Sequence, residues 1–387
     1  MNLLLLRPNT ANFAVPMILN GLRNDRRVGT IYQFPRGIRE FEDRSRMLPN
    51  LASPSYDDHL IASEREARRL LKSGAIQGVV ATNRYFDLRP RPGRRLRDTL
   101  QRLAKHAFPF SSRRRDIGAT FLLHWRDARR NIPVAIVDCR DNFTIREEDV
   151  ELLRLCCAYF KRELPFNRFN LFRPYAERLS RAEILDLSAK VRPIPLGVDD
   201  ALFEAWARER RAEKASDLFW SGKPNASQRL DLPERLREIA ARRGLRLDLA
   251  DGRLSFEEYR RRIASSKICV SVEGAGWDCY RHAEAIALGS IPMINEPTVD
   301  AAAWRAAPRE IFFRNDFSDF EEKLLVLTSN DRLREELQTR LDAFARAHLF
   351  WSRHAGRVLE ALRASSAPRP AQIPGADQRK RPIQHVG

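Results

Sequence analysis

The chain has 387 residues, 43% of them hydrophobic and 31% charged, and its formal net charge at pH 7 is +18. This length exceeds what one ordinary core holds and fits two domains of roughly 150 to 200 residues each. The composition excludes a membrane-embedded protein, because apolar runs such as residues 3–6 are far shorter than the ~18 residues that a spanning helix needs. Residues 1–3 have the pattern of a strand and not of a signal peptide, so we expect a cytoplasmic protein.

The positive charge is concentrated in residues 84–130, which hold fourteen Arg or Lys against four Asp. We expect this segment to be a basic insertion in the first domain. Three interpretations are open: a solvated surface, attraction to a phosphate-bearing acceptor or to the anionic inner face of a membrane, and binding of nucleic acid. The segment lacks zinc-ligand spacing, RNP-type aromatics and a recognition-helix pattern, so a nucleic-acid partner is disfavoured.

The first 200 residues alternate between apolar runs and helical patterns. Buried strands are predicted at residues 2–6, 78–81, 132–137 and 158–163. Strands that alternate with helices are typical of a parallel, doubly wound sheet, so residues 1–200 are expected to form one Rossmann-like domain. The charged run at 201–216 is expected to be a linker.

A second alternation starts after this run and is expected to form a second α/β domain over residues 217–345. Pro233 and Gly244 mark the start and the stop of one helix, and Ser255 with Glu258 forms a capping box that opens another. Strands are predicted at 218–220, 245–249, 268–272 and 291–294, and helices at 331–348 and 351–362. The tail at 366–387 has no periodicity and is expected to be disordered.

Residues 272–292 carry the pattern with the most chemistry. A buried strand ends in Gly274 and Gly276, which permit positive φ and close approach of a ligand, and a helix follows at once. Asp278 is expected to cap the start of this helix, and Gly289 its end. A helix that starts at the carboxyl edge of a parallel sheet favours a phosphate at its N-terminus.

Two charged residues follow in this helix. Arg281 lies in the first turn, where it would add a full positive charge against a diphosphate. Glu284 is three residues further on the same face, where its carboxylate would accept hydrogen bonds from sugar hydroxyls. The alternative is a structural ion pair between Arg281 and Glu284 on an exposed helix. The run is not the GxGxxG fingerprint of dinucleotide-binding proteins.

The stretch from the strand at 270–273 to the run at 289–292 resembles the donor-binding signature of GT-B glycosyltransferases, above all the exostosin-like and spore-coat-type groups. There a strand, a glycine turn, an Arg-x-x-Glu-Ala helix and a Gly-Ser-Ile-Pro strand entry recur. The run Phe219-Trp220-Ser221-Gly222-Lys223 resembles the opening strand and loop of the same domain. The similarity spans about residues 216–345 and, in part, 132–200.

The resemblance implies roles for particular residues. Lys223 or Arg229 would approach the donor diphosphate after the Ser221-Gly222 turn, together with Arg281. Glu284 would anchor the donor, and Trp277 would stack on a base or sugar, although a tryptophan packed in the core is an equal alternative. Retaining members often carry two glutamates separated by seven residues, but eight positions before Glu284 this chain has Gly276, and Glu273 is three residues too early. The stereochemical outcome therefore stays open.

Asp138 and Asp141 follow the predicted strand at 132–137 and are candidates for the base that deprotonates an acceptor hydroxyl. The alternative is a turn with capping aspartates. No zinc-ligand set is recognisable, and GT-B enzymes generally use protein cations where other folds use a metal-binding aspartate pair. The resemblance thus implies no metal and no cofactor, with a nucleoside diphosphate-sugar as the donor substrate.

The resemblance implies an α/β fold of two Rossmann-like domains that face a cleft, with a C-terminal helix at 346–365 that crosses back to the first domain. The stripe Trp351, Ala355, Val358 and Leu362 would supply the contact. The expected function is transfer of a sugar to a glycan, lipid-linked or protein acceptor. The alternatives are a fucosyltransferase-like enzyme and a non-catalytic basic protein that binds nucleic acid or an acidic polymer.

Overall fold

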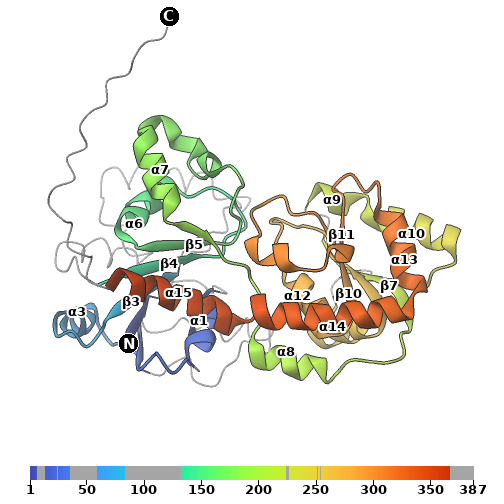
Figure 1. Ribbon diagram of the computed structural model, residues 1–387, viewed down its shortest axis with the longest axis horizontal. Coiled ribbons are helices and arrows are strands. Elements are labelled where there is room, and N and C mark those ends of the chain that lie inside the picture. The colour runs from blue at the N-terminus through green and yellow to red at the C-terminus, as the bar shows by residue number, and fades with distance from the viewer. Residues whose placement is uncertain are drawn as a thin grey trace, which may run out of the picture.

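The computed structural model describes residues 1–6, 14–23, 25–34, 59–82, 132–223, 226–250, 252 and 254–366. The elements form two α/β bodies side by side, and helices α14 and α15 follow one another along both (Figure 1). The basic segment expected at 84–130 and the tail from 367 lie outside the described residues. Ser366, expected to begin the tail, is instead the last residue of α15.

The first body is built on a six-stranded parallel sheet with the order β2-β1-β3-β4-β5-β6. The strands are β1 (Leu3–Leu6), β2 (Ile31–Phe34), β3 (Gly78–Thr82), β4 (Val134–Asp138), β5 (Ala158–Lys161) and β6 (Val191–Pro193). The short apolar runs are buried on both faces, as expected of strands covered by helices on either side.

Alternate residues of each strand pack on opposite helical layers. Leu3 and Leu5 join the cluster of α1 (Ala14–Arg23) and α15 (Trp351–Ser366), whereas Leu4 and Leu6 face the other layer. That layer contains α3 (Glu64–Lys72), α6 (Val150–Leu155) and α7 (Arg181–Ala189), with the 3-10 turns η3 (Glu147–Asp149), η4 (Arg168–Leu171) and η5 (Arg173–Arg178). The 3-10 turn η3 leads directly into α6.

The second body holds a five-stranded parallel sheet with the order β11-β10-β9-β7-β8. Its strands are β7 (Ser216–Trp220), β8 (Leu247–Leu249), β9 (Ser266–Val270), β10 (Ile291–Asn295) and β11 (Phe312–Phe313). Its helices are α9 (Ser227–Leu230), α10 (Leu232–Arg243), α11 (Phe256–Ala264), α12 (Tyr280–Ala287), α13 (Phe320–Ser329) and α14 (Asp331–His348), with 3-10 turns η6 (Ala302–Ala306) and η7 (Arg309–Ile311). Two doubly wound parallel sheets confirm the predicted fold class.

The segment expected to be a linker is partly helical. Helix α8 (Asp200–Ala207) buries Phe203 and Trp206 in the core of the second domain. Arg210 then donates to Asp342 of α14 through both terminal nitrogens at 2.7 Å. The chain is thus packed on the second domain from residue 200 onward.

Helix α15 crosses back to the first domain. The stripe Trp351, Ala355, Val358 and Leu362 is buried in the cluster that also holds the first sheet and α1. Trp351 Nε1 donates to the carbonyl of Leu196 at 2.9 Å. A Cβ added to Gly21 of α1 would lie 2.3 Å from the carbonyl oxygen of Trp351, so the two helix backbones are in close contact. The predicted crossover is confirmed.

Two adjacent stretches of chain join the domains. Val198 forms a parallel bridge with Phe350, in which Val198 N donates to Leu349 O at 2.9 Å and Trp351 N donates to Val198 O at 3.0 Å. Gly197 has a φ of +60°, and a Cβ there would lie 2.1 Å from Leu349 O. Within the described ranges, no helix has the length and apolar character to cross a membrane.

Candidate active site at the domain junction

The carboxyl ends of both sheets meet at the junction between the domains. Glu163, just after β5, accepts hydrogen bonds from the backbone N–H groups of Trp277 at 3.0 Å and Asp278 at 3.1 Å, both after β9. Asp278 in turn accepts from Leu196 N at 2.6 Å, and Asp300 N donates to Leu164 O at 2.6 Å. Open α/β sheets bind ligands at this edge, so the junction is the place to look for a site.

The glycine loop between β9 and α12 is shaped by close side-chain approach. Gly274 N donates to Gly276 O at 2.9 Å, which closes a tight turn. A Cβ on Gly274 would lie 2.8 Å from Arg229 Nη2, and one on Gly276 would lie 2.5 Å from both Arg162 Nη2 and Glu163 Oε1. Neither glycine uses the positive φ that its lack of a side chain permits. The two glycines leave room for the ends of neighbouring charged side chains.

Two arginines meet behind this loop. Arg229 of α9 is buried, and its guanidinium donates to the carbonyls of Glu273 at 2.8 Å and Val272 at 2.9 Å. Burial and then the nearby charge of Arg281 lower the pKa of Arg229. Arg281 of α12 has Nε and Nη1 buried without a hydrogen-bond partner. Both arginines of the predicted donor site are therefore brought to one place.

Glu284 lies one turn further along α12 and is buried beside α11. Its Oε2 accepts from the hydroxyl of Tyr259 at 2.9 Å, and burial raises its pKa. The positive charge of Arg281 acts on Glu284, but Glu284 is buried, so the alternative of an ion pair on an exposed helix does not describe this helix. Cys279 is the N-cap residue, because the carboxylate of Asp278 is turned to Leu196 in the first domain.

Trp277 is part of the core and does not face a ligand. It is almost fully buried, and its Nε1 donates to Asn295 O at 2.9 Å. Its ring contacts Trp304 edge-on at 5.8 Å and lies beside His282. Of the two alternatives for this residue, the packed tryptophan is the one that its burial supports, because the ring has almost no exposed surface on which a base or sugar could stack.

The loop after β7 contributes Ser221, Gly222 and Lys223. Ser221 and Gly222 are half-buried, and Lys223 is exposed. A Cβ on Gly222 would lie 2.9 Å from the indole ring of Trp220, which explains the glycine. The three residues lie at the same edge of the sheet as the glycine loop.

Asp138 is buried in a cluster of charges inside the first domain. It accepts from Arg140 Nε and Nη2, both at 2.8 Å, from Tyr159 OH at 2.8 Å and from Lys161 Nζ at 3.1 Å. Burial alone would raise its pKa, but Lys161 and Arg140 outweigh burial and hold the pKa well below the usual range. A fully buried carboxylate with three partners has neither access to an acceptor nor basicity, so Asp138 is corrected to a structural role.

Asp141 differs from Asp138 because its side chain is 34% exposed. It lies 2.7 Å from Nη1 of Arg162, whose Nε donates to Glu163 at 2.9 Å. Asp141 is thus connected through Arg162 to the interdomain contacts at Gly276. Of the two predicted candidates for a base, only Asp141 reaches the junction.

Sequence reasoning missed Arg162, Glu163 and the interdomain role of Asp278. The available signal was the run Lys161-Arg162-Glu163 directly after a buried strand, where charged residues mark the carboxyl edge of a sheet. A second missed feature is the polar cluster after β9 and β10, in which Glu273 accepts from Thr298 Oγ1 at 3.0 Å. No group of three or more His, Cys, Asp or Glu suited to a metal ion occurs in the described part of the chain.

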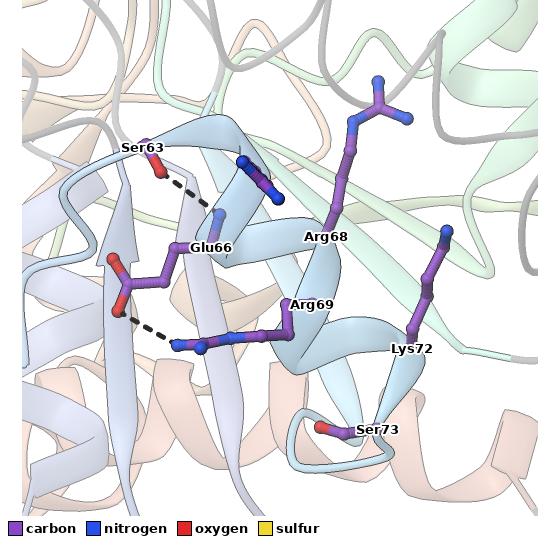
Figure 2. Close-up of a pocket in the computed structure, with 7 residues that line it drawn as sticks. Ser63, Glu66, Arg68, Arg69, Lys72 and Ser73 are labelled. Atoms are coloured by element: carbon purple, nitrogen blue, oxygen red, sulfur yellow. Dashed lines mark hydrogen bonds and ion pairs between the residues drawn. The ribbon is translucent and has the colours of Figure 1, made fainter.

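A separate hollow of about 1160 Å³ lies on α3, at the end of the first domain away from the second (Figure 1). Figure 2 shows Arg68 and Lys72 pointing to one side, while Arg69 turns to Glu66, 3.9 Å away. The hollow is far from the glycine loop and is lined mainly by basic side chains of one helix: Ser63, Arg65, Glu66, Arg68, Arg69, Lys72 and Ser73.

No family model matches the chain, and no curated protein matches it. Among solved structures, an α-glucosyltransferase in complex with UDP and a 13-mer DNA containing an HMU base is similar with a TM-score of 0.50 and 11% identity, over 94% of this chain and 99% of that one. A glycosyltransferase from Rickettsia africae has a TM-score of 0.49 and 10% identity, over 94% of this chain and 98% of that one. HepE from Anabaena in complex with UDP-glucose has a TM-score of 0.45 and 11% identity, over 94% of this chain and 100% of that one. At such identities the likeness concerns the fold: this chain has the two-domain GT-B fold.

Proposed function

We propose that this protein is a glycosyltransferase that transfers a sugar from a nucleoside diphosphate-sugar to a hydroxyl of a glycan, lipid-linked or protein acceptor. The observation that carries the proposal is the pair Arg229 and Arg281 behind the loop of Gly274 and Gly276. Arg229 is buried, and burial together with the charge of Arg281 lowers its pKa, while Nε and Nη1 of the half-buried Arg281 have no hydrogen-bond partner. A bound diphosphate would offset both charges and accept from those nitrogens.

The reaction assigns a role to each group at the junction. The acceptor hydroxyl oxygen forms a bond to the anomeric carbon, the bond from that carbon to the diphosphate breaks, and the nucleoside diphosphate leaves. Arg229 and Arg281, with Lys223 from the neighbouring loop, stabilise the charge that develops on the leaving group. The N-terminus of α12 adds its dipole. We propose that these protein cations perform this task without a metal ion.

The remaining groups bind the donor sugar and accept the proton of the acceptor hydroxyl. Glu284 would accept from donor hydroxyls, and Ser221 and Gly222 would line the phosphate path. Asp141 would take the proton of the acceptor hydroxyl, since Asp138 has been excluded by its burial. Trp277 would support the loop from the core. Within this proposal an exostosin-like enzyme is the first candidate, and a fucosyltransferase-like enzyme is the alternative.

The location of the protein and its basic surface remain predictions. The net charge of +18 and the basic helix α3 support attraction to an anionic membrane surface on the cytoplasmic side. A non-catalytic basic protein would share this charge but would have no need for a buried and a half-buried arginine beside a glycine loop. An experiment should therefore compare nucleoside diphosphates, which the glycosyltransferase would bind, with heparin and DNA, which a non-catalytic basic protein would bind.

The proposal is tested by thermal unfolding of the full chain with UDP, GDP, heparin and duplex DNA. A nucleotide at 100 times its Kd should stabilise the protein by about 2.7 kcal/mol. Arg281→Ala should remove most of this shift, Arg281→Lys should retain part of it, and Arg332→Ala, an exposed arginine on α14, should leave it unchanged. The proposal fails if neither nucleotide raises the Tm at millimolar concentration while heparin or DNA does.

A further inference from the structure

Helix α3 carries basic side chains along one face, at the end of the first domain away from the second (Figure 1). Arg65, Arg68, Arg69 and Lys72 are separated by three, one and three residues, which places them on one face over neighbouring turns of the helix. All four line the same hollow of about 1160 Å³. The geometry of the helix therefore gathers four cations around a volume that a ligand can enter.

Positive charge dominates the described residues that line this hollow. Among them Glu66 is the one carboxylate, and its Oε1 lies 3.9 Å from Nη2 of Arg69. Four positive charges against one negative charge leave a balance of +3. A phosphate monoester carries about −1.5 to −2 at pH 7, so two such groups are needed to offset this balance.

Hydroxyl groups lie at both ends of the basic face. Ser63 Oγ accepts a hydrogen bond from a backbone N–H of the first turn at 3.2 Å, and Ser73 Oγ donates to a backbone carbonyl of the last turn at 3.0 Å. Because Ser63 uses its oxygen as an acceptor, its O–H can still donate to a ligand. Figure 2 shows Arg68 and Lys72 extending to one side of the helix, so two of the cations face the same space.

We propose that the hollow on α3 binds a soluble ligand that carries two or more phosphate groups. A guanidinium donates to two oxygens of one phosphate at a time, and the ammonium of Lys72 adds a compact charge. None of the described lining residues is apolar, so none would insert into the acyl region of a bilayer. A membrane attracts the net charge of the protein without any need for a hollow, whereas a compact polyphosphate fits into one.

This inference goes beyond the proposed function, and either one can fail without the other. The hollow belongs to α3 of the first domain, whereas the proposed donor site is formed by Arg229 and Arg281 of the second. Because a polyphosphate would also be attracted to the donor site, binding is measured both in the wild type and in Arg281→Ala. Binding at α3 should be the same in both.

The test is isothermal titration calorimetry of the full chain with sodium tripolyphosphate, and with inorganic phosphate as the probe for a single group. Tripolyphosphate should bind at least about tenfold more tightly than inorganic phosphate, because it places several phosphates among the four cations. The double variant Arg65→Ala/Arg69→Ala should weaken tripolyphosphate binding by about tenfold or more. Lys72→Arg keeps the charge and should bind within about twofold of the wild type.

The matched control is the double variant Arg173→Ala/Arg181→Ala. It removes the same two charges from exposed positions of the same domain, on η5 and α7, and should bind tripolyphosphate as the wild type does. A loss of binding in this control as well would show that net charge, and not the hollow on α3, attracts the ligand, and would overturn the inference.

Phosphatidylglycerol vesicles and a short DNA duplex are the probes for other occupants. The inference is overturned if tripolyphosphate does not bind, if inorganic phosphate binds as tightly, or if Arg65→Ala/Arg69→Ala loses binding only to vesicles or DNA. A nucleotide shift that survives without tripolyphosphate binding at α3 would overturn only the α3 site. Tripolyphosphate binding that depends on Arg65 and Arg69, with no nucleotide shift, would overturn only the proposed donor site.

Discussion

Asp278 belongs to the glycine loop of the second domain, but its carboxylate is bound by the first. It is buried, and its Oδ2 accepts from Leu196 N at 2.6 Å. Burial raises the pKa of Asp278 to about 7, although the guanidinium of Arg162 and the bond from Leu196 act in the opposite direction. A carboxyl group at the domain junction is thus placed to titrate near neutral pH.

This gives a prediction about stability and pH. A carboxyl group whose pKa is higher in the folded than in the unfolded state binds more protons when folded, so its contribution to the free energy of unfolding falls as pH rises from about 4 to 7. Asp278→Asn imitates the protonated form. We expect this variant to be more stable than the wild type at pH 8 by about 2 to 4 kcal/mol in urea unfolding, and the difference to shrink toward zero at pH 4.

Asp186→Asn, an exposed aspartate on α7, provides the control and should show no such trend. A constant difference between Asp278→Asn and the wild type at every pH would mean that Asp278 does not titrate differently on folding.

Single residues also show what the sequence reveals about the site. Gly274, Gly276, Arg281 and Glu284 were recognisable because they follow one another within eleven positions. The bonds of Glu163 to the glycine loop join residues 114 and 115 positions apart, and no local pattern reports them. Asp138 was misassigned because the end of a strand can face solvent or a buried charge cluster, and only packing decides which.

Elements were predictable where their apolar pattern was local. The cores of β1, β3, β4, β7 and β10 and the stripe of α15 follow from runs of buried residues. Helix α8 was taken for part of a linker because a dense charged run, residues 208–214, follows it directly, whereas the helix itself buries only two aromatic residues, Phe203 and Trp206. Strand β8 starts two residues later than expected, since Leu245 and Arg246 connect it to α10.

Helix α15 carries a prediction at the scale of the element. Trp351 is buried in the cluster formed by the first sheet, α1 and α15, and its indole N–H donates to Leu196 O. Trp351→Ala should lower the free energy of unfolding by about 3 to 5 kcal/mol in urea titrations, because it leaves a cavity and an unpaired carbonyl. A chain that stops after Leu349 should be insoluble, because the apolar face of α1 loses its cover.

The control for α15 is Arg353→Ala, an exposed position on the same first turn, which should stay within about 0.5 kcal/mol of the wild type. A chain that stops after Ser366 should keep the stability of the full chain. Equal stability of Trp351→Ala and Arg353→Ala would show that the crossover contributes no more than a surface contact.

At the scale of the whole molecule, the two domains are joined on one side and bound on the other. The chain passes between the domains twice, near Val198 and near Phe350, and the β-bridge between these residues ties the two passages together by hydrogen bonds. Across the junction, Glu163 holds the amides of Trp277 and Asp278, and Asp300 holds Leu164 and Arg168. A rotation of the domains about the Val198–Phe350 bridge would break the junction contacts of Glu163 and Asp300 before it broke the bridge. We therefore expect the carboxylate of Glu163 to determine how readily the glycine loop separates from the first domain.

Glu163→Gln should therefore favour an open arrangement of the domains. The amide keeps the volume of the side chain, but its NH2 group faces a backbone donor and the pair with Arg162 is lost. Charge-assisted hydrogen bonds contribute about 1.5 to 3 kcal/mol each, so the open population should rise by at least about tenfold. Small-angle X-ray scattering without nucleotide should then give a larger radius of gyration than the wild type, while Glu177→Gln, an exposed glutamate of η5, should match the wild type. If the radius of gyration of Glu163→Gln is unchanged and circular dichroism shows an intact fold, then the contacts of Asp300, and not those of Glu163, hold the two domains together at the junction.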